Sequence, residues 1–257
     1  MDVVDAIHQA LELQGRNRDD EALQILLAAA EQHEDEDLWG EIALSYTIRG
    51  FKRPDAQAQE DFTEAEKWAE LPLTRVGLAG VAMRRKDFGR AEALVGEALE
   101  MDPELAEGRV FLGELRLHQG RVPEAVEILA KAVDVHPYAG AYAVLAQALE
   151  AAGKPDFAAK AVAEGLKKFP MSDLLLLELA RACVAAEDLE KARRVLEQAV
   201  TANDANAEAW RRLAWIAAKD GDESKMIESL DRASGIDREG TLAWIAKENL
   251  KLPEGNA

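Results

Sequence analysis

Aromatic residues are scarce in this chain, and cysteine is nearly absent. Phe, Trp and Tyr make up 5% of the 257 residues, although 48% of the residues are hydrophobic. Ala and Leu fill most of the apolar positions, and this composition favours closely packed helices. The single cysteine, Cys183, excludes a framework of internal disulfides.

The chain also lacks long apolar runs. Apolar runs such as Leu174 to Leu177 end far short of the roughly 18 residues that a membrane-spanning helix needs, so we expect no membrane insertion. The first residues have neither the basic start nor the continuous apolar stretch of a secretory signal. We therefore expect a cytoplasmic protein.

Basic residues are outnumbered by acidic ones. The 31 Lys and Arg residues face 49 Asp and Glu residues, which gives a formal net charge of −18. Binding to nucleic acid or to an anionic lipid surface depends on Lys and Arg, which displace counterions. The charge therefore argues against nucleic acid as a partner.

The sequence does contain an internal repeat. Pro103, Pro137 and Pro170 are spaced by 34 and 33 residues, and two amphipathic stretches of helical length lie between them, separated by a short polar break. Each unit therefore reads as a helical hairpin, too small to bury its own apolar face, so that neighbours must stack. Seven breaks predict seven hairpins: they lie at Gly15, Gly50, Lys86–Asp87, Gly120–Arg121, Gly153, Glu187 and Gly221.

Small residues recur at one position in each predicted helix, where they allow close helix packing. In the first helix of hairpins two to seven, this position is held by Ala43, Ala79, Gly113, Ala146, Ala180 and Ala214. In the second helix, it is held by Ala22, Ala65, Ala91, Ala125, Ala158 and Ala192, and then by Met226.

This pattern resembles that of tetratricopeptide repeat proteins. Trp39, Ile42, Ala43, Tyr46 and Gly50 match the first helix of that repeat, and Ala125, Leu129, Ala132 and Pro137 match the second. The resemblance implies an all-α fold, a right-handed superhelical solenoid of seven helix-turn-helix repeats followed by a capping helix. The expected single domain covers 1–252, with repeats at 1–35, 36–71, 72–105, 106–138, 139–172, 173–206 and 207–240, a capping helix at 241–250 and a frayed tail at 253–257.

Three departures from the repeat stand out. His8 falls at the small position of the first hairpin. Hairpin two has about ten extra residues at 51–60; either Pro54 opens a lengthened helix, or Asp61 and Glu64 form a capping box after an exposed loop, and we favour the loop. In the final helix Lys247 and Glu248 replace the apolar pair, so we expect a polar cap.

The sequence offers little evidence of catalysis. No two of the four histidines have the helical spacing that presents two ligands to one metal. His33 with the acidic run 34–37 would bind a divalent cation weakly, but a solvated turn is the simpler interpretation. We expect a non-enzymatic protein with no catalytic residue, cofactor or metal site.

In the family that the chain resembles, the first helices line a concave groove in which partners bind. That resemblance places a mostly apolar groove here, with a basic end formed by Arg181, Arg211, Arg212 and Lys219 around Trp215. Paired guanidinium groups suit a carboxylate or an acidic peptide, unless acids such as Glu178 and Glu208 neutralise them. The predicted partner-binding residues are Leu44, Val76, Met83, Val110, Glu114, Leu117, Ala143, Gln147, Leu177, Arg181, Arg211, Arg212, Trp215 and Lys219.

Two functions remain open. The first is an adaptor that holds a protein or peptide partner, possibly with an acidic segment, in this groove. The second is an architectural subunit that uses convex or end surfaces, which exposed Val4, Ile7 and Leu11 would support. The sequence names neither the partner nor the oligomeric state.

Overall fold

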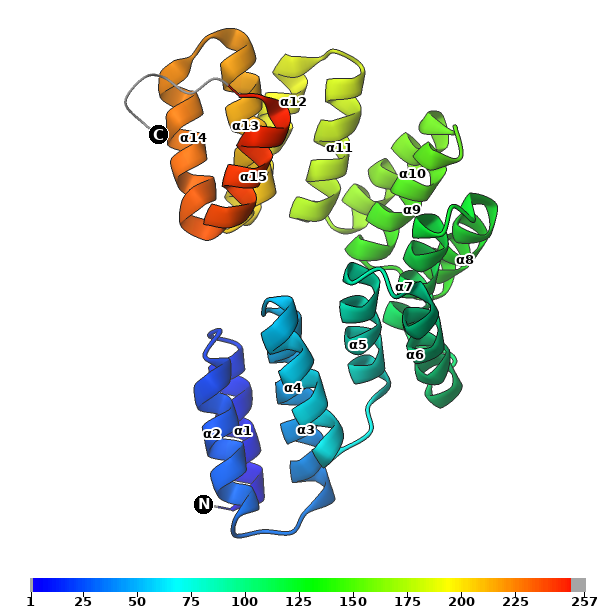
Figure 1. Ribbon diagram of the computed structural model, residues 1–257, viewed down its shortest axis with the longest axis vertical. Coiled ribbons are helices and arrows are strands. Elements are labelled where there is room, and N and C mark those ends of the chain that lie inside the picture. The colour runs from blue at the N-terminus through cyan, green and yellow to red at the C-terminus, as the bar shows by residue number, and fades with distance from the viewer. Residues whose placement is uncertain (1, 251–257) are drawn as a thin grey trace. The chain divides into compact units, whose positions relative to one another are not determined.

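The computed structural model describes residues 2–250, and all fifteen regular elements in that range are α-helices (Figure 1). The helices alternate with short turns, which confirms seven helix-turn-helix pairs and a final helix. Their bounds are α1 Val3–Gln14, α2 Asp19–Ala30, α3 Glu36–Phe51, α4 Asp55–Trp68, α5 Pro72–Arg84, α6 Phe88–Met101, α7 Ala106–His118, α8 Val122–Val135, α9 Ala139–Ala151, α10 Pro155–Lys168, α11 Asp173–Ala185, α12 Leu189–Ala202, α13 Ala207–Asp220, α14 Glu223–Ile236 and α15 Arg238–Glu248.

The chain divides into two compact units, Met1–Ile128 and Leu129–Ala257, and α8 contains the division. We describe each unit separately. A single solenoid over 1–252 stays a prediction, and the tail predicted at 253–257 lies outside the described residues.

The first unit packs its hairpins through small and aliphatic residues. Ala43 and Ala79, two of the predicted small positions, are fully buried, so the backbones of neighbouring helices approach closely there. The core of α5 and α6 extends to Phe62, whose ring is 1% exposed. A second cluster joins α1, α2 and α3; it contains Ala6, Ala10, Ala22, Leu23, Leu26, Ala29, Leu38 and Ile42.

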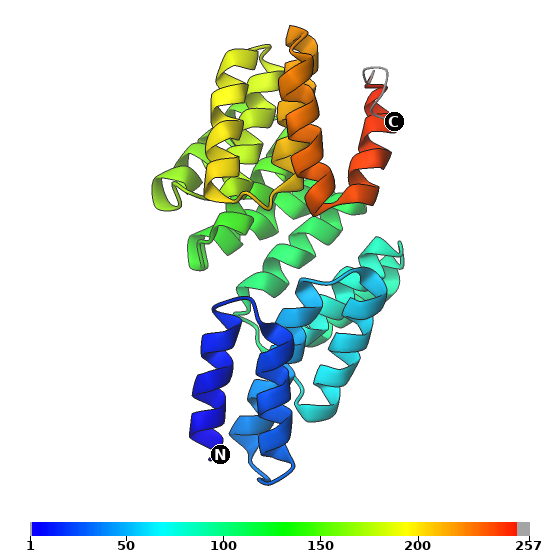
Figure 2. The same ribbon diagram turned by 90° about the vertical axis from the view of Figure 1, so that its left-hand side faces the viewer.

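The second unit repeats this arrangement. Ala180 and Ala214 are buried at the small position of α11 and α13. The last three helices, α13, α14 and α15, contact one another and are seen from a second side in Figure 2. Their core contains Ala214, Ala217, Met226 and Leu230, with Trp244 and Ile245 of α15 packed against it.

The turns inside the hairpins show why these helices end where they do. One residue in six of the seven turns has a left-handed backbone, with φ between 57° and 75°; these residues are Asn17, Lys86, Gly120, Gly153, Glu187 and Gly221. The predicted break at Gly15 lies where α1 ends, directly after Gln14, but the left-handed residue of this turn is Asn17. The first hairpin is therefore shifted by two residues, and buried Ala10, not exposed His8, occupies its small position.

The extra residues of hairpin two are helical, so the favoured loop at 51–60 is wrong. Helix α3 continues through Gly50 to Phe51, and Pro54 precedes α4 at its N-cap. Asp61 is not a helix cap either: it is 2% exposed and receives hydrogen bonds from Arg49. Pro54 therefore opens a lengthened helix, which was the alternative interpretation.

The final helix begins earlier than the predicted 241. Asp237 ends α14 and also caps α15, because its carboxylate accepts a hydrogen bond from the backbone N–H of Gly240. As a result Thr241 is fully buried, while Lys247 and Glu248 are exposed at the C-terminal end of the helix. A polar end on the cap is therefore observed.

Candidate functional site: a tryptophan pocket on the first helices

The predicted partner-binding residues lie on the first helices of hairpins in both units. Within the first unit, α3, α5 and α7 carry Leu44, Val76, Met83, Val110, Glu114 and Leu117. Within the second unit, α9, α11 and α13 carry Ala143, Gln147, Leu177, Arg181, Arg211, Arg212, Trp215 and Lys219. Val76, Val110 and Ala143 are at least nine-tenths buried, so these three belong to the core of the free chain.

Glu114 on α7 is an ionisable group in a partly apolar setting. Burial raises the pKa of its carboxyl group, while His118 and Arg84 oppose the rise. Nε2 of His118 lies 4.0 Å from Oε1 of Glu114. The ionised carboxylate is therefore held at a cost at neutral pH.

We expect Glu114→Gln to raise the stability of the chain at neutral pH. A carboxyl group whose pKa is higher in the folded chain binds more protons there than in the unfolded chain, so its contribution to stability falls as the pH rises through that interval. The advantage of the glutamine variant should vanish below the ordinary glutamate pKa, where both states are protonated. Urea unfolding at a series of pH values measures this, and an advantage that persists in acid would contradict the assignment to Glu114.

The three arginines of the predicted basic end are paired with acids of the same chain. Arg181 Nη2 lies 2.8 Å from Glu150 and 2.5 Å from Glu178, which also accepts a hydrogen bond from Gln147. Arg211 contacts Glu208 and Asp237, each within 3.1 Å. Arg212 Nη2 lies 2.8 Å from Glu208.

These ion pairs favour the interpretation that neighbouring acids neutralise the arginines over the interpretation that the arginines bind an acidic partner. Hydrogen bonds from Gly240 N–H and then Arg211 hold the pKa of Asp237 below its usual range, as expected for an engaged carboxylate. Arg181 and Arg211 thus already have the carboxylates that an acidic partner would supply.

A pocket opens beside this arginine cluster, on the surface formed by α11, α13 and α15. It has a volume of about 390 Å³. We call it the tryptophan pocket; it is lined by Val184, Glu208, Arg212, Trp215, Trp244, Lys247 and Glu248. The pocket therefore has two indole rings and charges of both signs.

Helix packing positions the two indoles. Trp215 is partly buried against the core of α11 and α12, and Trp244 packs on the core of α13 and α14. Lys219, one turn after Trp215, places its Nζ 5.1 Å from the centre of that ring. Trp215 and Lys219 also line an adjoining pocket of about 290 Å³ next to Gly221 and Asn249.

The structure thus brings together predicted Arg212, Trp215 and Lys219, and adds Trp244 and Lys247, which the sequence analysis did not place in the site. The sequence contained a signal, since Trp244 follows Trp210 by one repeat length of 34 residues. The early start of α15 at Arg238 was the missing information.

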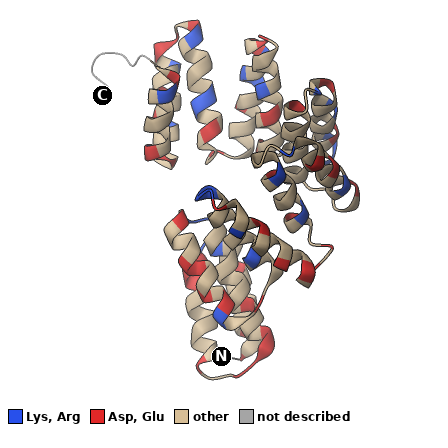
Figure 3. Cartoon of the chain, turned by 45° about the vertical axis from the view of Figure 1, so that its right-hand side comes forward, with Lys and Arg blue, Asp and Glu red and all other residues tan. Residues whose placement is uncertain are grey.

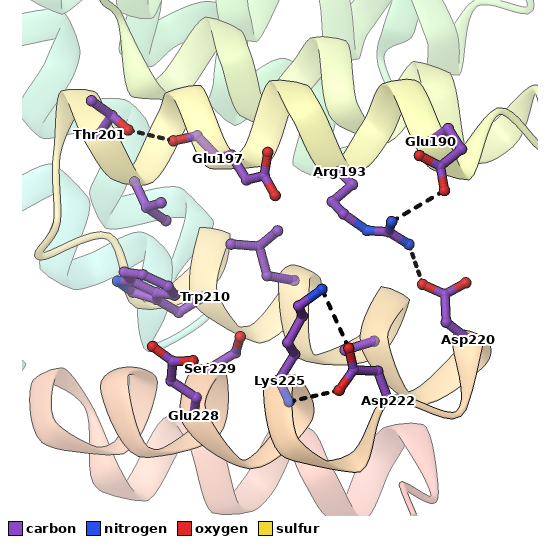
Figure 4. Close-up of a pocket in the computed structure, with 13 residues that line it drawn as sticks. Glu190, Arg193, Glu197, Thr201, Trp210, Asp220, Asp222, Lys225, Glu228 and Ser229 are labelled. Carbon is purple, nitrogen blue, oxygen red and sulfur yellow. Dashed lines mark hydrogen bonds and ion pairs between the residues drawn. The ribbon is translucent and has the colours of Figure 1, made fainter.

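The opposite side of α13 holds a different hollow, between α12 and α14, with a volume of about 610 Å³ (Figure 4). We call it the second-helix groove. Its rim is closed by ion pairs: Arg193 contacts Glu190 and Asp220, and Lys225 contacts Asp222. Trp210 lies at one end, and its indole Nε1 donates a hydrogen bond to the backbone carbonyl of Asp204.

Evidence for metal or thiol chemistry is absent from the described range. Within residues 2–250, no three His, Cys, Asp or Glu side chains form a group able to hold a metal ion. Acidic residues gather at the turn beside the N-terminus, where 34–37 lie (Figure 3). Cys183 is buried, and burial raises the pKa of its thiol, which disfavours the reactive thiolate.

We also searched the helices of the described range for a membrane-spanning segment. Every helix within residues 2–250 is too short or too polar to pass through a lipid bilayer.

Comparison with protein families identifies the repeat. A model described as a tetratricopeptide repeat matches residues 82–148, and another model of the same description matches residues 173–216. No curated protein sequence matches the chain.

Solved structures resemble the fold at low sequence identity. A tetratricopeptide repeat protein from Parabacteroides merdae is 14% identical, with a TM-score of 0.65, over 95% of this chain and 97% of that one. A thermophilic repeat protein from Thermus thermophilus is 21% identical, with a TM-score of 0.61, over 70% of this chain and all of that one. Yeast Tom70 is 17% identical, with a TM-score of 0.64, over 90% of this chain and 59% of that one.

The helical pairs and the final helix place this protein in the class of helical-repeat proteins. Within that class, the chain is a tetratricopeptide repeat protein. Proteins of this family are typically interaction scaffolds and are generally non-enzymatic.

Proposed function

We propose that this chain is a non-enzymatic scaffold that binds a peptide or protein partner through the surface formed by α11, α13 and α15. The tryptophan pocket is the observation that supports this proposal. It combines two partly exposed indoles with Arg212 and Lys247 at its rim. Tryptophan and arginine in a pocket are the residue types that most often dominate binding energy at protein interfaces.

The chemistry of the pocket favours an apolar anchor residue flanked by polar groups. The indoles of Trp215 and Trp244 offer flat apolar surface, whereas Glu208 and Glu248 balance the charges of Arg212 and Lys247. The pocket is therefore neutral in sum. A bulky apolar side chain of the partner would bind between the rings, while its backbone and polar neighbours meet the charged rim.

A random peptide library displayed on phage and selected against the full chain tests this proposal. For peptides that bind, Trp215→Ala should weaken binding roughly 30-fold, because a central aromatic anchor contributes about 2 kcal/mol. Fluorescence anisotropy of the synthesised peptides measures the change, and circular dichroism checks that the variant is folded.

Trp210→Ala is the matched control. It removes the same side chain from the same helix, but Trp210 lines the second-helix groove. Binding to this variant should stay within about threefold of the unmodified chain. Equal losses in both variants, or none in Trp215→Ala, would contradict the proposed pocket.

A second function, an architectural subunit, is favoured by one observation. On α1 the side chains of Val4 and Leu11 are 62% and 47% exposed. They present apolar surface at the start of the array, and a neighbouring subunit would cover it. Sedimentation velocity measures self-association, and a strict monomer would count against assembly between copies through this surface.

We further propose that this protein does not bind nucleic acid, since its net charge is −18.

A further inference from the structure

The first turn of α10 differs from hairpins three, six and seven at the residue before the helix, and from every other hairpin at the third residue of the helix. The residue before the second helix is an aspartate in hairpins three, six and seven, where Asp87, Asp188 and Asp222 accept hydrogen bonds from backbone N–H groups of the first turn. In α10 this residue is Lys154, which forms no side-chain cap. Helix α10 therefore lacks a stabilising contact that three equivalent helices have.

The third residue of the second helix shows the other departure. It is Phe157 in α10, and the phenyl ring is 59% exposed. At the equivalent position the other hairpins have polar residues: Glu21, Gln57, Arg90, Glu124, Lys191 and Lys225. An exposed aromatic ring thus replaces a polar side chain next to the missing cap.

One lysine packs against the exposed ring. Lys160 Nζ lies 5.2 Å from the centre of Phe157, and within residues 2–250 neither Lys154 nor Lys160 forms an ion pair. By contrast, Arg181, Arg193 and Arg211 of the same unit each contact two carboxylates.

Residues 154–168 contain four lysines and two acids, in a chain whose net charge is −18. Asp156 is the acid of the first turn, and Glu164 accepts a hydrogen bond from Tyr142. The positive end of the α10 dipole adds to the field of the lysines. The surface of α10 is therefore cationic, and its lysine charges are available to a partner.

We propose that Lys154, Phe157 and Lys160, the α10 patch, form a docking site for an acidic segment of another protein. Carboxylates of that segment contact the two lysines, and an apolar side chain next to them covers Phe157. Charge complementarity selects this occupant, since the lysines lack the internal carboxylates that neutralise Arg181 and Arg211. The patch is separate from the tryptophan pocket, so this site adds a second contact to the proposed scaffold.

The test uses the full chain and a fluorescein-labelled peptide, acetyl-Asp-Glu-Leu-Phe-Glu-Asp-amide, with fluorescence anisotropy as the readout. Lys154→Asp, which introduces the capping residue of hairpins three, six and seven, should weaken binding at least about tenfold. The same substitution should raise the midpoint of thermal unfolding by about 2 °C, because it supplies the missing cap. Phe157→Gln, which introduces the residue of hairpin two without changing the charge, should also weaken binding about tenfold while leaving that midpoint unchanged.

Controls separate this site from general electrostatics and from the tryptophan pocket. Lys191→Asp makes the same charge change on α12 and should leave binding within about threefold, as should Trp215→Ala. The neutral peptide, with Asn and Gln in place of Asp and Glu, should bind at least about tenfold more weakly to the unmodified chain.

Several results would overturn the inference. They are no binding of the acidic peptide, equal losses in Lys154→Asp and Lys191→Asp, and a fall in thermal stability in Lys154→Asp. Patch-dependent self-association in sedimentation velocity, or patch-dependent binding to phosphatidylserine vesicles in place of the peptide, would also overturn it, since the occupant would then be a second copy or a membrane. Loss of peptide binding in Trp215→Ala alone would support binding at the tryptophan pocket and contradict a docking site at the α10 patch.

Discussion

Replacing Arg49 with leucine should destabilise the first unit by about 3–5 kcal/mol, because it leaves a buried carboxylate without its main partner. Asp61 of α4 is 2% exposed. Arg49 Nε donates to its two oxygens at 3.2 and 3.1 Å, and Nη2 donates to Oδ1. After the substitution only Arg53 would remain, with Nη1 at 3.4 Å from Oδ2.

Urea unfolding followed by circular dichroism measures this loss, and two further variants interpret it. Lys67→Leu removes an exposed ion pair with Glu64 on α4, the helix of Asp61, and should leave stability nearly unchanged. The double variant Arg49→Leu with Asp61→Leu should recover most of the stability, since no unpaired charge is then buried. A loss in Arg49→Leu as small as in Lys67→Leu would show that water reaches Asp61.

This ion pair shows what the repeat pattern could not predict about the fold. Periodicity predicted the helical pairs, because small residues at a fixed position are needed wherever helices stack. The insertion in hairpin two has no counterpart in the repeat, so only local signals remained. Asp61 resembled a helix cap in the sequence, but its partner Arg49 lies on the preceding helix, and that pairing depends on α3 continuing past Gly50.

The first hairpin shows a second limit. Gly15 was placed at the same repeat phase as the later breaks, yet the left-handed residue of this turn is Asn17. Asparagine tolerates this conformation better than most residues, so glycine alone was an incomplete signal. The two-residue shift then misplaced the small position from Ala10 to His8.

The candidate site was predictable where it depends on one helix and unpredictable where it depends on several. Arg212, Trp215 and Lys219 follow from their phase on α13. Trp244 and Lys247 enter the pocket only because Asp237 both ends α14 and starts α15. Glu178 and Glu208 were already candidates in the sequence for pairing with these arginines. The second partners, Glu150 of Arg181 and Asp237 of Arg211, lie 31 and 26 residues away, so only the structure identifies them.

Gly77→Ala should destabilise the first unit by about 2 kcal/mol, although alanine is the better helix former by about 1 kcal/mol. A Cβ atom at residue 77 would lie 2.4 Å from Cε1 and Cζ of Phe62. The ring has little room to move away, because it is 1% exposed and a Cβ atom at Gly50 would also lie 2.7 Å from its Cε1. Phe51 also packs against the ring, at 5.2 Å between centroids.

The same substitution should change sign when the ring is removed. In a Phe62→Leu background Gly77→Ala should stabilise the chain by up to about 1 kcal/mol, since only the gain in helix propensity remains. Gly96→Ala is the matched control within α6: no atom lies within 4 Å of its added Cβ, so it should stabilise the chain by about 1 kcal/mol in either background. Urea unfolding of the four-variant cycle measures the coupling. If Gly77→Ala stabilises the unmodified chain as much as Gly96→Ala does, the Phe62 ring is free to move, and the two glycines do not hold it.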